Sequence, residues 1–394
     1  MGNRSSTVTS PGAPPPLLSA AVTGDVATFT SLWQTATDNG STMITDRQGN
    51  NVLHALFSCR VPTGKPHEII QLIHDTLSSS SLLQQQQLKQ LVSLYEVRNQ
   101  LGCTPLWILI AYGNVPLLQQ VVEMIMETTK DNDNTVHRLL AEKLPTLLSQ
   151  PNYQGDSPLL ATCSQGNLEM VKYLASSTSL FLKNQTMAQA LQQGNKKGTT
   201  PLQIVVSIGH LELLKYLTES ESLLTVDQIW QMNAAGLSLF HICSERNFYE
   251  GLKVLLNYLG NKKDDDSGPL DRDIVSKVLH LQDKNGANAL HVACFCGHVE
   301  TVETWIRVIT QSSASTQATT ELLDCPDGQG RTAYWLAMVQ GHDETIGKAL
   351  AAAGATTDQP IQMLQEIEQA QQQRASKRQS TNAPIDGNAL LKQR

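Results

Sequence analysis

The chain has 394 residues, and 29 Lys and Arg stand against 36 Asp and Glu. The resulting formal net charge of −7 argues against non-specific binding to nucleic acid, although a local basic patch is compatible with it. The seven cysteines are scattered and odd in number, unlike a disulfide framework. The sequence shows no signal peptide and no apolar run of about 18 residues. We therefore expect a soluble protein of a reducing compartment, the cytoplasm, with a core of Leu, Ile, Val and Ala because aromatics make up only 5%.

Residues 1–14 carry almost no apolar side chains, which predicts a disordered N-terminal segment. The segment begins MGNRSS and fits the pattern M-G-x-x-x-[ST], which predicts N-myristoylation of Gly2 after removal of Met1. One acyl chain holds a protein at a membrane only marginally, and Arg4 is the sole nearby cation. The predicted membrane association is therefore peripheral, weak and reversible.

One module recurs along the rest of the chain, with two glycines that lie eleven residues apart. Five copies keep both glycines: GCTPLWILIAYG from Gly102, GDSPLLATCSQG from Gly155, GTTPLQIVVSIG from Gly198, GANALHVACFCG from Gly286 and GRTAYWLAMVQG from Gly330. Two degenerate copies align with these five but lack the second glycine: GNNVLHALFSCR from Gly49 and GLSLFHICSERN from Gly236. An eighth copy near the start, PPPLLSAAVTGD, lacks the leading turn.

The residue types in the module predict a turn followed by two helices. The first glycine follows Asn or Asp by three residues, which is the pattern of a tight turn with a positive φ at the glycine. Thr or Ser then precedes Pro, as in Thr104-Pro105, and this is a strong helix start because the hydroxyl caps the helix and Pro suits its first position. The second glycine ends this short helix, and an amphipathic helix such as NLEMVKYLA follows.

Successive leading glycines are separated by 53, 53, 43, 38, 50 and 44 residues, so the connection to the next turn is long and variable. Five of these connections carry apolar residues at helical spacing: LLQQQQLKQLVSLYEV, TVHRLLAEKLPTLL, TVDQIWQM, RDIVSKVLHL and TTELLD. We expect an extra short helix in most repeats, just before the next turn. The alternative is a second helix that is extended and frayed.

This module resembles the ankyrin repeat, whose signature T-P-L-H-x-A follows a turn and precedes G-H-x-E-V-V. The match is close at Gly155–Leu174, Gly198–Leu217 and Gly286–Ile306, whereas Asn247 replaces the second glycine in the copy from Gly236. The resemblance implies an all-α solenoid of about eight helix–turn–helix repeats over residues 15–358, with β-turn or hairpin connections and helical inserts. Residues 359–394 are expected to form a C-terminal helix and a flexible tail with a small basic cluster.

The segment LHVACFCGH contains His291, Cys294, Cys296 and His298 within nine residues. Taken alone, such a group is typical of a metal site or of a thiol nucleophile beside its base. The resemblance gives a plainer explanation for His291, Cys294 and His298, because a histidine or a small residue is usual at these repeat positions. It implies that His291 hydrogen-bonds the backbone of the neighbouring repeat, and we expect neither a metal nor a cofactor.

The resemblance also implies a function, which is a non-catalytic scaffold or adaptor that binds one or more proteins on a concave surface. Trp107 and Trp335 stand at the histidine position of their repeats, which puts the usual hydrogen bond between repeats in doubt there; alternatively, they simply fill core volume. The candidate binding residues are side chains of turns and first helices that the repeat pattern leaves free: Trp107, Tyr112, Tyr153, Gln154, Lys196, Lys197, Arg246, Phe295, Arg331, Trp335 and Gln340.

The sequence is compatible with three other functions. An enzyme would need catalytic residues in the inserts or in the Cys/His segment, but the chain has no phosphate loop or nucleophile elbow. A regulator associated with nucleic acid or chromatin would need a basic stripe, and only Lys196, Lys197 and the tail offer one. A secreted bacterial effector would use the same repeats to bind a host protein. We expect no small-molecule substrate and no nucleic acid partner.

Overall fold

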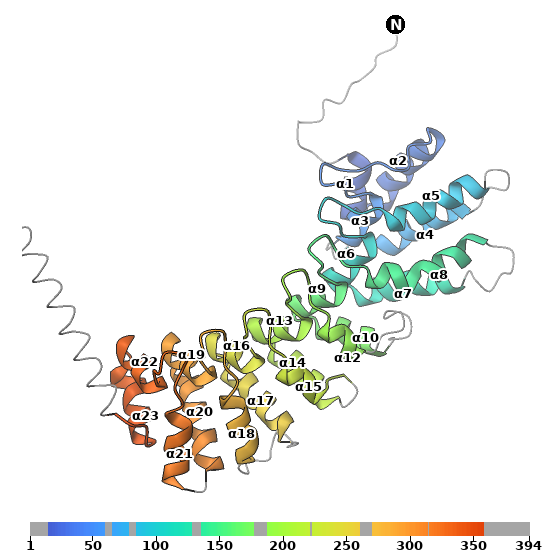
Figure 1. Ribbon diagram of the computed structural model, residues 1–394. Helices are drawn as coiled ribbons and strands as arrows, with labels where there is room; N and C mark the ends of the chain where they lie inside the picture. Colours follow the sequence, from blue (N-terminus) through green and yellow to red (C-terminus); the bar gives the residue numbers. More distant parts are fainter. Residues whose placement is uncertain are drawn as a thin grey trace, which may run out of the picture. The chain divides into compact units, whose positions relative to one another are not determined.

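The computed structural model describes residues 15–59, 65–78, 84–127, 135–176, 187–220, 223–260, 270–313 and 315–357. The regular elements in these ranges are all helices, and none of the helices is both long and apolar enough to span a membrane. The chain forms two compact units, Met1–Gln228 and Ile229–Arg394 (Figure 1). Gly2 and the segments 1–14 and 359–394 lie outside the described residues.

In unit 1, each repeat contributes a short first helix and a longer second helix (Figure 1). The five pairs are α1 (Pro16–Thr23) with α2 (Val26–Asp38), α3 (Val52–Phe57) with α4 (Pro66–Ser78), α6 (Pro105–Tyr112) with α7 (Val115–Glu127), α9 (Pro158–Gln165) with α10 (Leu168–Ser176), and α13 (Pro201–Ile208) with α14 (Leu211–Glu219). The first helices pack on one another in sequence order, from α1 through α3, α6 and α9 to α13. Each repeat is therefore held by its neighbours, as expected of a solenoid.

Unit 2 repeats the arrangement with three pairs. These are α16 (Leu239–Glu245) with α17 (Tyr249–Leu259), α19 (Ala289–Cys296) with α20 (Val299–Ser312), and α22 (Ala333–Val339) with a π-helical turn (Asp343–Gly347) that runs into α23 (Lys348–Ala352). Here α16 packs on α19, and α19 packs on α22. The predicted all-α repeat fold is confirmed.

The expected insert helices are present in both units as separate helices. They are α5 (Gln84–Glu96), α8 (Thr135–Ser149), α15 (Val226–Trp230), α18 (Arg272–Leu279) and α21 (Thr316–Leu323). The alternative of a single extended second helix is therefore wrong for these five connections. A further insert, α12 (Met187–Gln192), was not predicted, although its buried residues Met187, Ala190 and Leu191 have helical spacing.

The first helices begin and end as their sequences predict. The Thr104 side chain accepts a hydrogen bond from the backbone N–H of Trp107, and Pro105 occupies the first helical position of α6. Gly113 ends that helix at φ 75°, in the left-handed region. In the degenerate copy from Gly236, Asn247 occupies the position of the second glycine, with φ 54°. After Gly, Asn is the residue type that best tolerates a left-handed backbone. The repeat geometry therefore survives the loss of the glycine.

Candidate interaction surfaces

The turns that precede the first helices are closed by their leading Asp or Asn. The Asn152 side-chain oxygen, for example, accepts hydrogen bonds of 2.9 Å from the backbone N–H groups of Gln154 and Asp156. Seven turns share this pattern, with leading residues Asp46, Asn99, Asn152, Asn195, Asn233, Asp283 and Asp327. Because the backbone donors are satisfied inside each turn, the side chains at its tip are left for other contacts.

A buried histidine joins neighbouring repeats at three places. The Nε2–H group of His54 donates to the Cys103 carbonyl at 2.9 Å, that of His241 to Ala287 at 2.9 Å, and that of His291 to Arg331 at 3.0 Å, as was predicted for His291. Each accepting carbonyl belongs to the fourth residue after the leading Asp or Asn of the next turn. Burial lowers the pKa of all three histidines below the ordinary 6.5 and outweighs the raising effect of these hydrogen bonds. They therefore act as neutral donors.

Four predicted site residues of unit 1 lie together on two adjacent turns. Tyr153, Gln154, Lys196 and Lys197 are all exposed, and the Lys196 N–H donates to the Gln154 carbonyl at 3.1 Å, which joins the two turns. Tyr153 keeps 55% of its surface exposed.

Two neighbours of this group were not predicted. Leu101 is 62% exposed at the tip of the preceding turn, and its carbonyl accepts the N–H of Tyr153 at 3.0 Å. The Arg98 guanidinium lies 5.8 Å from the Tyr153 ring and donates to the Pro151 carbonyl. The available signal for Leu101 was a leucine at a turn tip, where five of the six sister turns carry a polar residue and the other carries Ala235.

In unit 2 the structure brings two predicted residues, Phe295 of α19 and Arg331 of the next turn, to one cavity of about 280 Å³. Phe295 is 53% exposed. The Arg331 side chain pairs with Asp327 at 2.7 Å, and its guanidinium lies 5.4 Å from the centre of the Trp335 ring. Burial opposes ionisation of Asp327, but the hydrogen bonds from Arg331 prevail and lower the pKa of that carboxyl. This arrangement fixes the arginine beside an exposed aromatic side chain.

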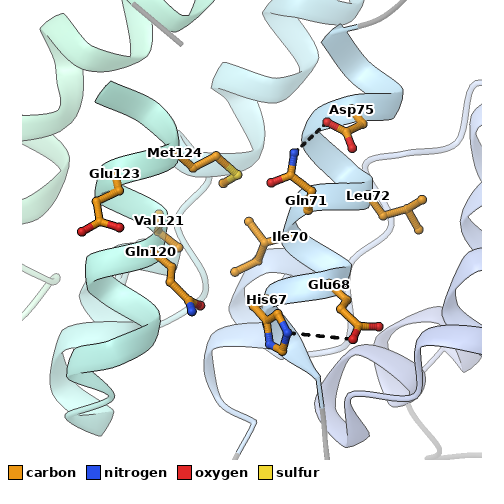
Figure 2. Close-up of a pocket in the computed structure, with 10 residues that line it drawn as sticks. All are labelled: His67, Glu68, Ile70, Gln71, Leu72, Asp75, Gln120, Val121, Glu123 and Met124. Carbon is orange, nitrogen blue, oxygen red and sulfur yellow. Dashed lines mark hydrogen bonds and ion pairs between the residues drawn. The ribbon is translucent and has the colours of Figure 1, made fainter. Parts of the chain in front are cut away.

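A larger cavity, of about 650 Å³, lies between the second helices α4 and α7 of unit 1 (Figure 2). Ile70 and Met124 point toward one another between the helices, and polar side chains surround them (Figure 2). The lining carboxylates are those of Glu68, Asp75 and Glu123. The cavity was not predicted, because it arises from the packing of two helices whose sequences show no shared motif. Its acidic lining contrasts with the cations on the turns.

A comparison with protein-family models gives one match, to the ankyrin repeat, at residues 285–306. This stretch includes α19 and the start of α20, and its His291 makes the contact between repeats described above. This match to one repeat supports an ankyrin-repeat protein. A search of curated proteins found no match.

The ankyrin template accounts for the Cys/His segment by hydrogen bonding and burial. His291 uses both ring nitrogens, since Nδ1 contacts the Asn288 cap, and the Nε2 of His298 contacts the Glu245 carbonyl at 2.9 Å. Cys294 is fully buried, and burial raises the pKa of its thiol, which keeps it protonated at neutral pH. Among the described residues, no group of three His, Cys, Asp or Glu side chains is placed to hold a metal ion.

The two tryptophans at the ankyrin histidine position differ from each other. The Trp107 indole N–H donates to the Asp156 carbonyl at 3.0 Å, so the doubt about a hydrogen bond between repeats was wrong at this position. At Trp335 the hydrogen bond between repeats is missing, because its indole nitrogen is buried without a hydrogen-bond partner in the described part of the chain.

The remaining predicted residues lie at the C-terminal ends of first helices. Tyr112 ends α6, Arg246 follows α16 and Gln340 follows α22, and all three are exposed. None of them lines either cavity described above.

Proposed function

We propose that this ankyrin-repeat protein is a non-catalytic adaptor that binds partner proteins through the turns and first helices of its repeats. The observation that carries the proposal is the exposure of large apolar side chains there, above all Leu101, Tyr153 and Phe295. Large aromatic side chains with an arginine nearby are the residue types that dominate binding energy at protein interfaces. Phe295 beside Arg331, and Tyr153 beside Arg98, have this composition.

The adaptor proposal is tested by affinity purification of the full-length protein from cells, followed by mass spectrometry. We expect a reproducible set of partner proteins, and we expect Phe295→Ala or Tyr153→Ala to deplete at least one of them. Met126→Ala is the matched control, because Met126 is 42% exposed but lies on the second helix α7. Failure of the wild-type protein to retain any partner, or equal retention by all variants, would contradict the proposal.

We also propose that the adaptor resides in the cytoplasm and attaches reversibly to membranes through myristoylated Gly2. The support is the N-terminal sequence MGNRSS alone. The test is the intact mass of the N-terminal peptide from eukaryotic cells, with Gly2→Ala as the control that cannot be acylated. A free N-terminal glycine in the wild-type protein would refute this part without affecting the adaptor proposal.

A further inference from the structure

The cations of unit 1 fall into two classes by their surroundings. Among the described side chains of this unit, the lysines on or beside the second helices and inserts are all paired with glutamates: Lys65 with Glu68, Lys143 with Glu96, Lys172 with Glu169, and Lys215 with Glu212. The other described cations of the unit are Arg47, Arg98, Lys196 and Lys197, and these lie on or next to the turns. None of these four has an ion-pair partner among the described residues.

The carboxylates of the same turns are engaged in hydrogen bonds and are only partly exposed. Asp46 accepts hydrogen bonds from the backbone of its own turn and from the Asn50 side chain. Asp156 accepts from the side chains of Asn152 and Asn195, at 3.2 and 2.8 Å. Both carboxylates are thus held by hydrogen bonds and are only partly exposed, whereas Arg47, Lys196 and Lys197 at the turn tips are exposed.

Apolar side chains are interspersed with these cations. Leu101 and Tyr153 are 62% and 55% exposed, and they stand on consecutive turns. The four turns are joined by backbone hydrogen bonds, from Gln100 to Gln48, from Tyr153 to Leu101 and from Lys196 to Gln154. A surface held in this way loses little conformational entropy when it binds a partner. We call it the turn edge, defined by Arg47, Arg98, Leu101, Tyr153, Gln154, Lys196 and Lys197.

We propose that the turn edge of unit 1 binds an extended acidic segment of a partner protein. The carboxylates of that segment pair with the four cations, and an apolar side chain among them packs on Leu101 and Tyr153. The inference rests on the proposed adaptor function and specifies the chemistry of one partner.

A nucleic acid is the less favoured occupant of the same edge. Binding to nucleic acid depends on many phosphate contacts, and the turn edge offers four cations in a chain of net charge −7. A short acidic peptide with an apolar side chain fits both the charge and the exposed Leu101.

The test uses fluorescence anisotropy with the purified full-length protein and a fluorescein-labelled peptide of glutamates around a central leucine. We expect the double variant Lys196→Glu with Lys197→Glu to bind this peptide about tenfold or more weakly. The matched control is Lys172→Glu with Lys215→Glu, which makes the same change of net charge in the same unit, away from the turns. We expect this control to change binding by less than about twofold. Leu101→Ser should weaken binding severalfold without lowering the unfolding temperature, because the leucine is exposed.

In the binding assay, three results would overturn the inference: no binding of the acidic peptide by the wild-type protein, equal losses in the two double variants, or tighter binding of a single-stranded oligouridylate than of the peptide. A peptide with glutamine in place of glutamate checks that charge is responsible. Cellular purification with the Lys196→Glu, Lys197→Glu variant separates this inference from the adaptor proposal. An unchanged set of partners would leave the adaptor in place and remove the acidic partner from the turn edge.

Discussion

The indole N–H of Trp107 donates to the backbone carbonyl of Asp156 at 3.0 Å, the contact that His54, His241 and His291 make in other repeats. The common requirement is a planar ring with one N–H group that reaches the carbonyl of the next turn. A tryptophan meets this requirement with a donor that cannot titrate near neutral pH.

The tryptophans provide a matched test of this contact. We expect Trp107→Phe to lower the free energy of unfolding by about 1 kcal/mol, because it removes a donor to a backbone carbonyl. Trp335→Phe should cost less or be stabilising, since the indole N–H of Trp335 has no partner in the described residues. Urea denaturation followed by circular dichroism measures both changes. Equal losses in the two variants would show that ring volume, and not the hydrogen bond, is responsible.

The buried histidines predict a loss of stability in acid. The pKa values of His54, His241 and His291 are lowered by burial in the folded protein, whereas in the unfolded chain they lie near 6.5. The unfolded chain therefore takes up more protons as the pH falls through 6.5, and stability falls with it.

We expect the urea midpoint to be lower at about pH 5.5 than at about pH 7.5, and His291→Gln to reduce this difference. Gln is the suitable replacement because Gln203 occupies the same position after the cap Thr200 and contacts the cap in the same way. A destabilisation by His291→Gln that is identical at both pH values would refute a titration effect at this residue.

The cysteines are expected to react with a thiol reagent according to their burial. Burial raises the pKa of Cys103 to about 11 and that of Cys163 to about 12, and Cys294 is also fully buried. In the folded protein we expect Ellman's reagent to modify Cys296, which is half-buried, well before Cys294. Peptide mapping after timed labelling distinguishes the two. In urea they should react alike, and similar rates in the folded state would contradict the burial described here.

Two glycines of unit 2 separate the effect of backbone strain from that of crowding. Gly286 and Gly330 have φ values of 75° and 77°, but a Cβ atom on Gly286 would collide with the backbone of Gly328, whereas on Gly330 it would meet nothing within 4 Å. We expect Gly330→Ala to cost about 1–2 kcal/mol from the left-handed backbone alone. Gly286→Ala should cost clearly more. Equal unfolding midpoints for the two variants would mean that the turns can move apart freely.

The turns and first helices were predictable because their signals are local. A leading Asp or Asn, a glycine three residues later and a hydroxyl cap fix the backbone within a few residues, as Asn152, Gly155 and Ser157 illustrate. The insert helices were predictable for the same reason, from their apolar period.

The surfaces were predicted only in part, because they depend on contacts between residues far apart in sequence. Tyr153, Lys196 and Phe295 were identified as candidates, but Arg98 was missed since its place beside Tyr153 follows from the packing of two repeats. The hydrogen bond of Trp107 was missed because the reach of an indole to Asp156, 49 residues away, cannot be judged from the repeat pattern.

The distribution of charge within unit 1 affects the rate at which a charged partner associates with it. The turns lie at one side of this unit and the longer helices α4, α5, α7 and α8 at the other (Figure 1). We expect the exposed cations on the first side, together with carboxylates such as Glu123 on the second, to give the unit an electric dipole. A negatively charged molecule that diffuses toward it experiences a torque that favours arrival turn side first. The association rate constant should therefore fall as added salt shortens the Debye length, even where the final contacts are largely apolar.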